Sequence, residues 1–212
     1  MVSRKRKNIM SPNIILIDAE HLDAMTFEMI VNFERMLGRR IPTADLPNWL
    51  DYIVLDSGFR PGENTFQAVF IHRKESAALQ HFSPSRFAED LHEKAFKDNL
   101  GEFQLTSFPI EPIVSREDFL VETFEALLLD PKVEHVMLVA DLEVEGESGQ
   151  SLLPRIKQLC ATPPIPEGAD APLPRKDITL FAMQPISGRG FQSEIVGYSL
   201  TAALGVRSGE FA

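Results

Sequence analysis

The chain has 212 residues, of which 44% are hydrophobic and 25% are charged, the ordinary composition of a globular protein with a sizeable core. Its formal net charge of −10 argues against nonspecific attraction to nucleic acid or to anionic membranes, because both need clustered cations. The single cysteine, Cys160, rules out an internal disulfide framework and fits a reducing compartment.

Residues 1–12 contain a dense run of cations, RKRK at 4–7, and are expected to form a basic, flexible tail. The apolar stretch behind this tail contains Pro12 and is cut short by Asp18, so it lacks the uninterrupted apolar region of a signal peptide. No window approaches the length of a membrane span. We therefore expect a cytoplasmic protein that does not insert into membranes.

The first predicted strand covers residues 13–19, NIILIDA, a continuous apolar run typical of a strand buried on both faces of a parallel sheet. A helix is expected to follow it. Apolar residues from Met29 to Leu37 recur at helical spacing, and Gly38 stands where a C-terminal cap belongs.

The next segment, DLPNWLDYIVLDSG, contains YIVLD, which resembles a strand ending in a phosphoacceptor aspartate. Its apolar residues nevertheless keep helical spacing from Leu46 to Val54. Asp45 can cap the start of such a helix, and Gly58 can close its end. We therefore predict a helix, with Asp56 as a surface acid near its end.

Three further strands and three further helices are predicted before the last strand. In chain order they are a strand at 65–72 (TFQAVFIH), a helix at 83–96 with Phe87, Leu91 and Ala95 on one face, a strand at 102–108 (EFQLTSF) and a helix at 115–129 opened by Ser115. The remaining elements are a buried strand at 136–140 (VMLVA), a helix at 151–160, a proline-rich surface loop at 162–176 and a strand at 177–183 (DITLFAM).

Strands that alternate with helices favour a mainly parallel sheet with helices on both faces. We predict a three-layer, doubly wound α/β domain over residues 13–183, with five strands. The strand at 13–19 is expected at the centre, between the strands at 65–72 and 136–140.

Residues 184–212 form a separate C-terminal segment, and its part at 191–206, FQSEIVGYSLTAALGV, is apolar with almost no charge. Two interpretations stay open. The stretch can pack on the chain's own sheet as a last helix, or it can be an association surface for a second copy or a separate protein. Glycines within and beside the stretch weaken a helix and so favour association.

Acidic side chains follow two of the predicted parallel strands. Asp18 ends the first strand, and Asp141 and Glu143 come directly after the strand at 136–140. In an open parallel sheet the carboxyl ends of neighbouring strands meet in one crevice. Acids gathered there would hold Mg²⁺ or Mn²⁺, which could activate water for phosphodiester cleavage.

Each of these residues also has a structural explanation. Asp118 fits a helix N-terminal acid stabilised by backbone amides. Asp141 and Glu143 fit a solvated loop, and His21 fits a surface histidine as well as a metal ligand or phosphate donor. Asp18 is the strongest functional candidate, because a buried carboxylate costs desolvation unless it is paired or faces a crevice.

Two stretches resemble the PIN and NYN ribonuclease-like domains. IILIDAEHL resembles their first strand, which ends in an aspartate followed three residues later by an asparagine, and LVADLEV resembles a later strand followed by a short acidic motif. SREDFLVETFEALLLDPKVEHV matches the helix between them, where the family carries another acid near the start. The resemblance implies metal-binding acids at Asp18, Asp118 and Asp141, with Glu143 in the place of a further aspartate, and RNA as the substrate.

The departures from the family pattern fall within the motifs themselves. His21 replaces the asparagine, Glu143 replaces an aspartate, and Val139 and Ala140 replace a Ser-Gly pair. Together with the acidic net charge, they lead us to expect a catalytically degenerate domain that acts as a binding or scaffold module. The alternative is a Mg²⁺- or Mn²⁺-dependent ribonuclease in which Asp18 and Asp141 are catalytic.

Other phrases resemble an uncharacterised bacterial family without an assigned activity. They are LGRRI at Leu37–Ile41, the DLPxxLxYxxLDxG pattern at Asp45–Gly58 and LGEF at Leu100–Phe103. This resemblance implies no substrate or cofactor.

Overall fold

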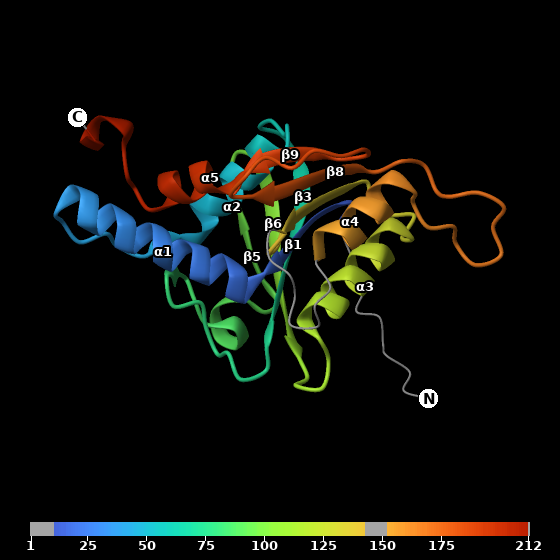
Figure 1. Cartoon of the computed structure of the whole chain (residues 1–212), viewed down its shortest axis with the longest axis horizontal. Helices are drawn as coiled ribbons and strands as arrows, with labels where there is room; N and C mark the ends of the chain where they lie inside the picture. Colours follow the sequence, from blue (N-terminus) through green and yellow to red (C-terminus); the bar gives the residue numbers. More distant parts are fainter. Residues whose placement is uncertain (1–10, 143–151, 212) are drawn as a thin grey trace.

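The computed structural model describes residues 11–142 and 152–211 and shows a central sheet with helices on both faces (Figure 1). The main sheet has seven strands in the order β5-β6-β3-β1-β7-β8-β9. From one edge to the other they are β5 (Lys94–Lys97), β6 (Gly101–Ile110), β3 (Asn64–Arg73), β1 (Asn13–Asp18), β7 (His135–Val139), β8 (Asp177–Ala182) and β9 (Gln192–Ile195). β5 pairs with β6 in antiparallel fashion, and the other neighbouring pairs are parallel.

The expected α/β class and the central position of β1 are confirmed, because β1 pairs with β3 on one side and with β7 on the other. The chain builds outward from β1 to β3 and β6, then returns to add β7, β8 and β9 on the opposite side. Strand order therefore reverses between β1 and β7. The expected number of five strands is wrong, because the edge strands β5 and β9 also join the sheet.

The apolar run of β1 reflects burial on both faces of the sheet. Ile15 and Ile17 face one hydrophobic cluster, whereas Ile14 and Leu16 face the other. All four side chains have 0% exposure. No side chain in the middle of this strand reaches water. The sequence therefore shows no alternation of apolar and polar residues there.

Five α-helices in the described part cover the two faces. Helices α1 (Ala19–Leu37), α2 (Leu46–Asp56) and α5 (Val196–Ala203) lie on one face, and α3 (Arg116–Leu128) and α4 (Leu152–Ala161) lie on the other (Figure 1). Asp18, Asp45 and Ser115 cap the starts of α1, α2 and α3 with their side-chain oxygens. The prediction of a helix in place of a YIVLD strand is confirmed, since Trp49 and Val54 lie within α2 and are fully buried.

The predicted helix at 83–96 is wrong. The structure has a two-residue strand β4 (Phe82–Ser83) paired with β2 (Ala44–Asp45), a single helical turn η1 (Phe87–Leu91) and then β5. Glu93 has a φ of 57°, which ends the helical path. Phe96 instead stacks on Phe103 of β6 with ring centroids 4.7 Å apart, so pairing with a strand edge overrides the helical spacing.

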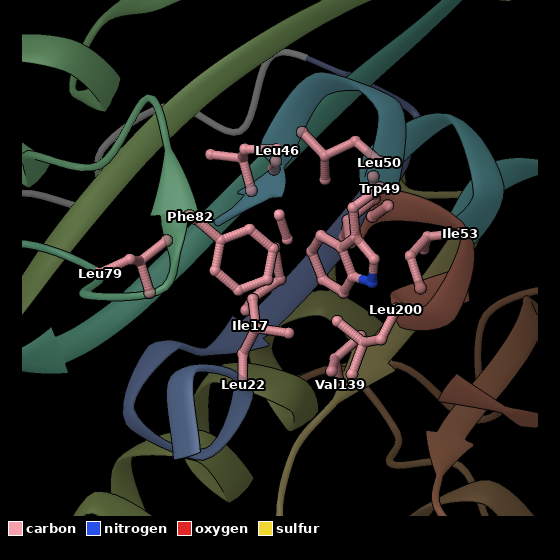
Figure 2. Close-up of a cluster of buried hydrophobic side chains, with 14 of the residues drawn as sticks. Ile17, Leu22, Leu46, Trp49, Leu50, Ile53, Leu79, Phe82, Val139 and Leu200 are labelled. Carbon is pink, nitrogen blue, oxygen red and sulfur yellow. The ribbon is translucent and has the colours of Figure 1, made fainter. Parts of the chain in front are cut away.

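The C-terminal segment belongs to the sheet and the core. β9 pairs with β8, and the fully buried Trp49 of α2 donates its indole N–H to Ser199 Oγ of α5 at 3.2 Å. Figure 2 shows the Trp49 ring between Phe82 of β4 and Ile53 of its own helix, with Leu200 of α5 beside it. Of the two interpretations of this stretch, packing on the chain's own sheet is therefore the one that the structure shows. Apolar side chains of this segment are buried within the chain, including Val196, Leu200, Leu204 and Val206.

The rest of the described chain is irregular or short. Residues 162–176 form the expected surface loop, and a 3₁₀ turn, η2 (Ser208–Phe211), follows α5. Residues 1–10 of the predicted basic tail lie outside the described part of the chain, and so does Glu143. Within the described part, no helix combines the length and apolar character needed to cross a bilayer.

Candidate functional site at the carboxyl ends of β1 and β7

The reversal of strand order places the carboxyl ends of β1 and β7 side by side. This is the position where open α/β sheets form their ligand-binding crevice. Asp18 is the last residue of β1, and Asp141 follows the end of β7 by two residues. The structure therefore brings these two predicted residues to one edge of the sheet.

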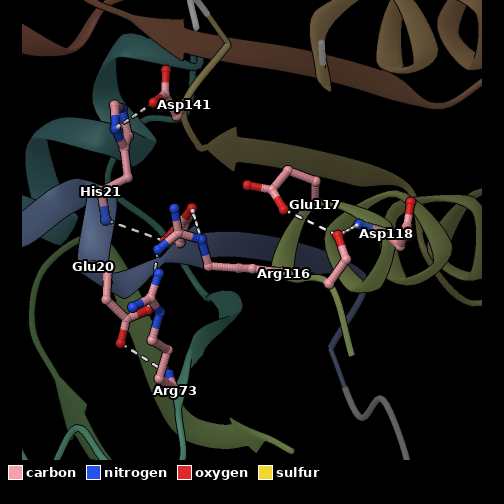
Figure 3. Close-up of polar contacts among 9 residues, drawn as sticks. Glu20, His21, Arg73, Arg116, Glu117, Asp118 and Asp141 are labelled. Atoms are coloured by element: carbon pink, nitrogen blue, oxygen red, sulfur yellow. Dashed lines mark hydrogen bonds and ion pairs between the residues drawn. The ribbon is translucent and has the colours of Figure 1, made fainter. Parts of the chain in front are cut away.

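Asp18 is almost completely buried, with 1% exposure. Its Oδ1 accepts a hydrogen bond from the backbone N–H of His21 at 3.1 Å, which caps α1. Its Oδ2 lies 3.2 Å from Nε of Arg116, the first residue of α3 (Figure 3). Both carboxylate oxygens therefore have a positively polarised partner supplied by the protein.

Burial raises the pKa of Asp18 to about 6, while the guanidinium of Arg116 and the amide of His21 oppose this rise. The nearby carboxylates of Glu20 and Asp141 raise the pKa further. Asp18 is therefore ionised at neutral pH, and Arg116 is the full positive charge that makes this ionisation tolerable.

Arg116 also connects the two layers of helices at this edge. It extends from α3 toward the start of α1, where its Nη1 lies 3.7 Å from Glu20 Oε2 (Figure 3). Glu20 Oε1 in turn accepts a hydrogen bond from the backbone N–H of Arg73, the last residue of β3, at 2.8 Å. Asp18, Arg116, Glu20 and Arg73 form a chain of contacts, which we call the edge network.

His21 and Asp141 form a second pair beside the edge network. The distance from His21 Nδ1 to Asp141 Oδ2 is 3.9 Å, and the side chains are 18% and 34% exposed. Burial lowers the pKa of His21, whereas the carboxylate of Asp141 raises it and Arg116 lowers it. The distance of 3.9 Å is longer than a hydrogen bond, and the lowered pKa of His21 favours the uncharged imidazole at neutral pH.

The structure does not bring Asp118 to this edge. Its Oδ1 lies 2.6 Å from Arg155 Nη1 on α4, and its side chain is 47% exposed. Its backbone N–H donates to Ser115 Oγ at 3.2 Å, as the capping interpretation requires. Figure 3 shows Asp118 on the same helix as Arg116, but only Arg116 extends toward the start of α1. Asp118 therefore joins α3 to α4.

The described residues among the predicted ligands are not arranged as a divalent metal centre, and Glu143 lies outside the described part. No group of three or more histidine, cysteine, aspartate or glutamate side chains in the described part is placed to hold an ion. Arg116 lies against Asp18, and Asp118 pairs with Arg155. Of the predicted ligands, Asp141 and His21 remain beside Asp18.

Sequence reasoning missed Arg116, although one signal was present. A cation in the first turn of a helix opposes the positive end of the helix dipole, so it needs a separate anionic partner. Arg116 stands directly after the capping residue Ser115, and its partner is Asp18, far away in the sequence.

No curated protein and no solved structure shows a significant match to this chain. The expected likeness to an uncharacterised family is confirmed, because the model of a family of unknown function (DUF6621) matches residues 7–211, and the chain belongs to that family.

Proposed function

We propose that this protein is a catalytically degenerate, PIN/NYN-like domain that acts as a binding or scaffold module. The observation that carries the proposal is the ion pair between Asp18 and Arg116 at 3.2 Å. In a metal-dependent nuclease the acid that ends the first strand has to present its oxygens to a divalent ion. Here the same oxygens cap a helix and face a guanidinium.

Electrostatics explains why this arrangement opposes metal binding. Two unit charges of the same sign about 4 Å apart repel by about 4 kcal/mol at an effective dielectric constant near 20, and a divalent ion doubles that term. An ion bound to Asp18 would therefore have to move Arg116 aside. Moving Arg116 would also uncover Glu20, whose Oε2 is buried.

The Mg²⁺- or Mn²⁺-dependent ribonuclease is the second candidate, and one observation favours it. Asp18 and Asp141 lie close enough at the carboxyl edge that the charge of Asp141 raises the pKa of Asp18. Under this candidate, Asp18 and Asp141 would hold the ion, with His21 beside them. The ion would supply an activated water.

An RNA hydrolysis assay with Mn²⁺ separates the two candidates. The wild type, Asp18→Asn, Asp141→Asn and the control Asp170→Asn, which changes an exposed acid in the loop at 162–176, are assayed together. We expect the same background cleavage from all four proteins. Mn²⁺-dependent cleavage by the wild type and by Asp170→Asn that is lost in Asp141→Asn would overturn the proposal and establish the nuclease.

A further inference from the structure

A hollow of about 490 Å³ lies at the opposite end of the sheet from the edge network, at the amino-terminal ends of β7, β8 and β9. Its volume falls in the range of about 300–1,000 Å³ that is usual for small-molecule sites. We call it the amino-edge pocket. Its lining includes Phe59, His135, Met137, Arg175, Thr179, Phe191 and Gln192.

The pocket exists because the helices leave part of one sheet face uncovered. Met137, Thr179 and Gln192 are neighbours across three strands and point to the face that carries α2 and α5. α2 ends at Asp56, and α5 packs over the carboxyl-terminal part of the same face through Leu200. The floor of the pocket is therefore rigid sheet.

Polar side chains line the pocket, and one buried atom among them lacks a partner within the described part of the chain. Thr179 is buried, with 6% exposure. The Nδ1 atom of His135 is buried without a hydrogen-bond partner, while its Nε2 lies 3.2 Å from Asp177 Oδ2. Buried polar atoms normally have partners, so the Nδ1 atom of His135 is suited to a ligand that supplies one.

The charges around the pocket favour an anion at one end. Lys176 donates to the backbone carbonyl oxygens of Asp130 and Val133, so its ammonium group is already engaged. The exposed Arg175 forms no ion pair with any described residue, so its guanidinium is free to bind a carboxylate or phosphate. Asp56 directly precedes the lining residue Ser57, and its pKa is raised by burial and, to a smaller extent, by the charge of Glu194.

Two glycines hold the aromatic wall in place. A Cβ on Gly188 would lie 2.4 Å from the Phe191 ring, and a Cβ on Gly190 would lie 2.1 Å from the backbone oxygen of Cys160. The chain before β9 can therefore lie tightly against α4, where Phe191 packs against the cluster on the α3 and α4 face and also lines the pocket. Phe59, which follows α2 in the chain, also lines the pocket. Its ring packs edge-on against His135, with ring centroids 4.9 Å apart.

We propose that the amino-edge pocket binds a small organic anion with a planar apolar body, whose acidic group pairs with Arg175 and whose body contacts Phe59 and Phe191. Thr179 and Gln192 supply hydrogen bonds to its polar substituents. This inference does not depend on the edge network, and it holds whether or not the carboxyl edge hydrolyses RNA.

Isothermal titration calorimetry on the full chain tests the proposal with three probes, phenyl phosphate, benzoate and the neutral benzyl alcohol. We expect at least one acid to bind with a dissociation constant of about 1 mM or lower, and more tightly than the alcohol. Tighter binding of phenyl phosphate would identify a phosphate head group, and tighter binding of benzoate a carboxylate. Failure of both acids to bind would overturn the proposal.

The charge contact is tested by Arg175→Gln, with Arg189→Gln as a matched control. Arg189 lies in the same region of the chain and is exposed, but it does not line the pocket. We expect Arg175→Gln to weaken binding of the acid at least about tenfold, as loss of a charged hydrogen bond does, and Arg189→Gln to leave it unchanged. Equal affinity in Arg175→Gln and wild type would contradict the assignment. A second measurement locates the bound acid. We expect the probe to shift the backbone amide NMR signals of Thr179 and Gln192.

Discussion

The guanidinium of Arg116 lies 3.2 Å from the carboxylate of Asp18, so the acid that ends the central strand is paired with a cation from a helix on the far face of the sheet. Asp18 is almost wholly buried and Arg116 is 21% exposed. A pair of this kind is strongly coupled, because removing one member leaves the other charge without a partner in a poorly hydrated place.

We predict that Arg116→Gln destabilises the protein by about 3 kcal/mol at pH 8, since it leaves the Asp18 carboxylate buried and unpaired. The double variant Asp18→Asn/Arg116→Gln should recover most of this loss, because no buried charge remains. Urea denaturation of the wild type, the two single variants and the double variant measures the coupling. Additive losses would show that Asp18 and Arg116 do not interact.

The Arg116→Gln variant should also depend on pH in a defined direction. Burial already raises the pKa of Asp18 to about 6 in the presence of Arg116, and removing the guanidinium raises this pKa further. The carboxyl group then becomes neutral as the pH falls toward 5, and the penalty disappears. We expect the stability deficit of the variant to be smaller at pH 5 than at pH 8. A deficit that is constant across this range would exclude Asp18 as its source.

Asp51 gives a second pH-dependent prediction. Burial, a hydrogen bond with Asp98 and the charge of that residue raise the pKa of Asp51 to about 7. Since the folded state binds this proton more tightly than the unfolded state, the resulting stability is complete below pH 4 and is lost as the pH rises through 7. We expect the wild-type melting temperature to fall between pH 6 and pH 8.

Asp51→Asn should flatten this dependence and raise the melting temperature at pH 8, because the amide keeps a donor without a charge. Asp170→Asn, in the exposed loop, serves as the control for a change in net charge. The ionisation of Asp18 should also lower the melting temperature as the pH rises through about 6, and this part of the pH dependence should persist in both variants. An unchanged slope between pH 6 and pH 8 in Asp51→Asn would show that another group titrates there.

The elements that sequence reasoning found are those in which burial is complete along a stripe or on both faces. β1 is apolar at each central position, and α2 buries Leu46, Trp49, Leu50 and Ile53 at helical spacing. The edge strands give no such signal. Lys94 and Lys97 of β5 are exposed, and no residue of β9 is fully buried, so only their pairing with β6 and β8 identifies them as strands.

The candidate site was predictable only in part for a related reason. Asp18 and Asp141 follow buried strands, so topology brings them together once β1 and β7 are neighbours. Arg116 finds Asp18 through the position of α3 and the reach of a long side chain. Asp118 lies two residues further along the same helix, and that step turns its carboxylate toward Arg155 instead.

The contact between Trp49 and Ser199 predicts that the C-terminal segment is required for folding. Ser199→Ala leaves the buried indole N–H without a partner and should cost about 1–3 kcal/mol. Leu200→Ala removes a fully buried side chain from the same cluster and should cost about 3 kcal/mol. Tyr198→Ala is the matched control on α5, since Tyr198 is 76% exposed, and its unfolding free energy should be unchanged.

Truncation after Gln184 extends this test to the whole segment. It removes β9 and α5, exposes Trp49 and unpairs β8, so we expect circular dichroism to show an unfolded chain. A folded truncated protein would contradict the core role of the segment.

Association through residues 191–206 stays a prediction, now limited to exposed side chains such as Tyr198. Light scattering compares the molar mass of Tyr198→Ser with that of the wild type and so measures this association.

Gly190 and Gly168 offer a last prediction, because both have positive φ angles, of 85° and 78°, but different surroundings. A Cβ on Gly168 would meet nothing within 4 Å, whereas a Cβ on Gly190 would lie 2.1 Å from the backbone oxygen of Cys160. Gly168→Ala should therefore cost only the backbone strain of a left-handed residue, about 1 kcal/mol. Gly190→Ala adds a clash with backbone that cannot rotate away.

We expect Gly190→Ala to be the more destabilising of the two in urea denaturation, and to affect the edge of the sheet first. The clash forces the chain before β9 away from α4, so the pairing of Gln192 with Thr179 should weaken. Amide hydrogen exchange should then be faster in β9 in Gly190→Ala and unchanged there in Gly168→Ala. Equal losses of stability in the two variants would mean that backbone strain alone explains both, and that the close approach of Gly190 to Cys160 contributes nothing.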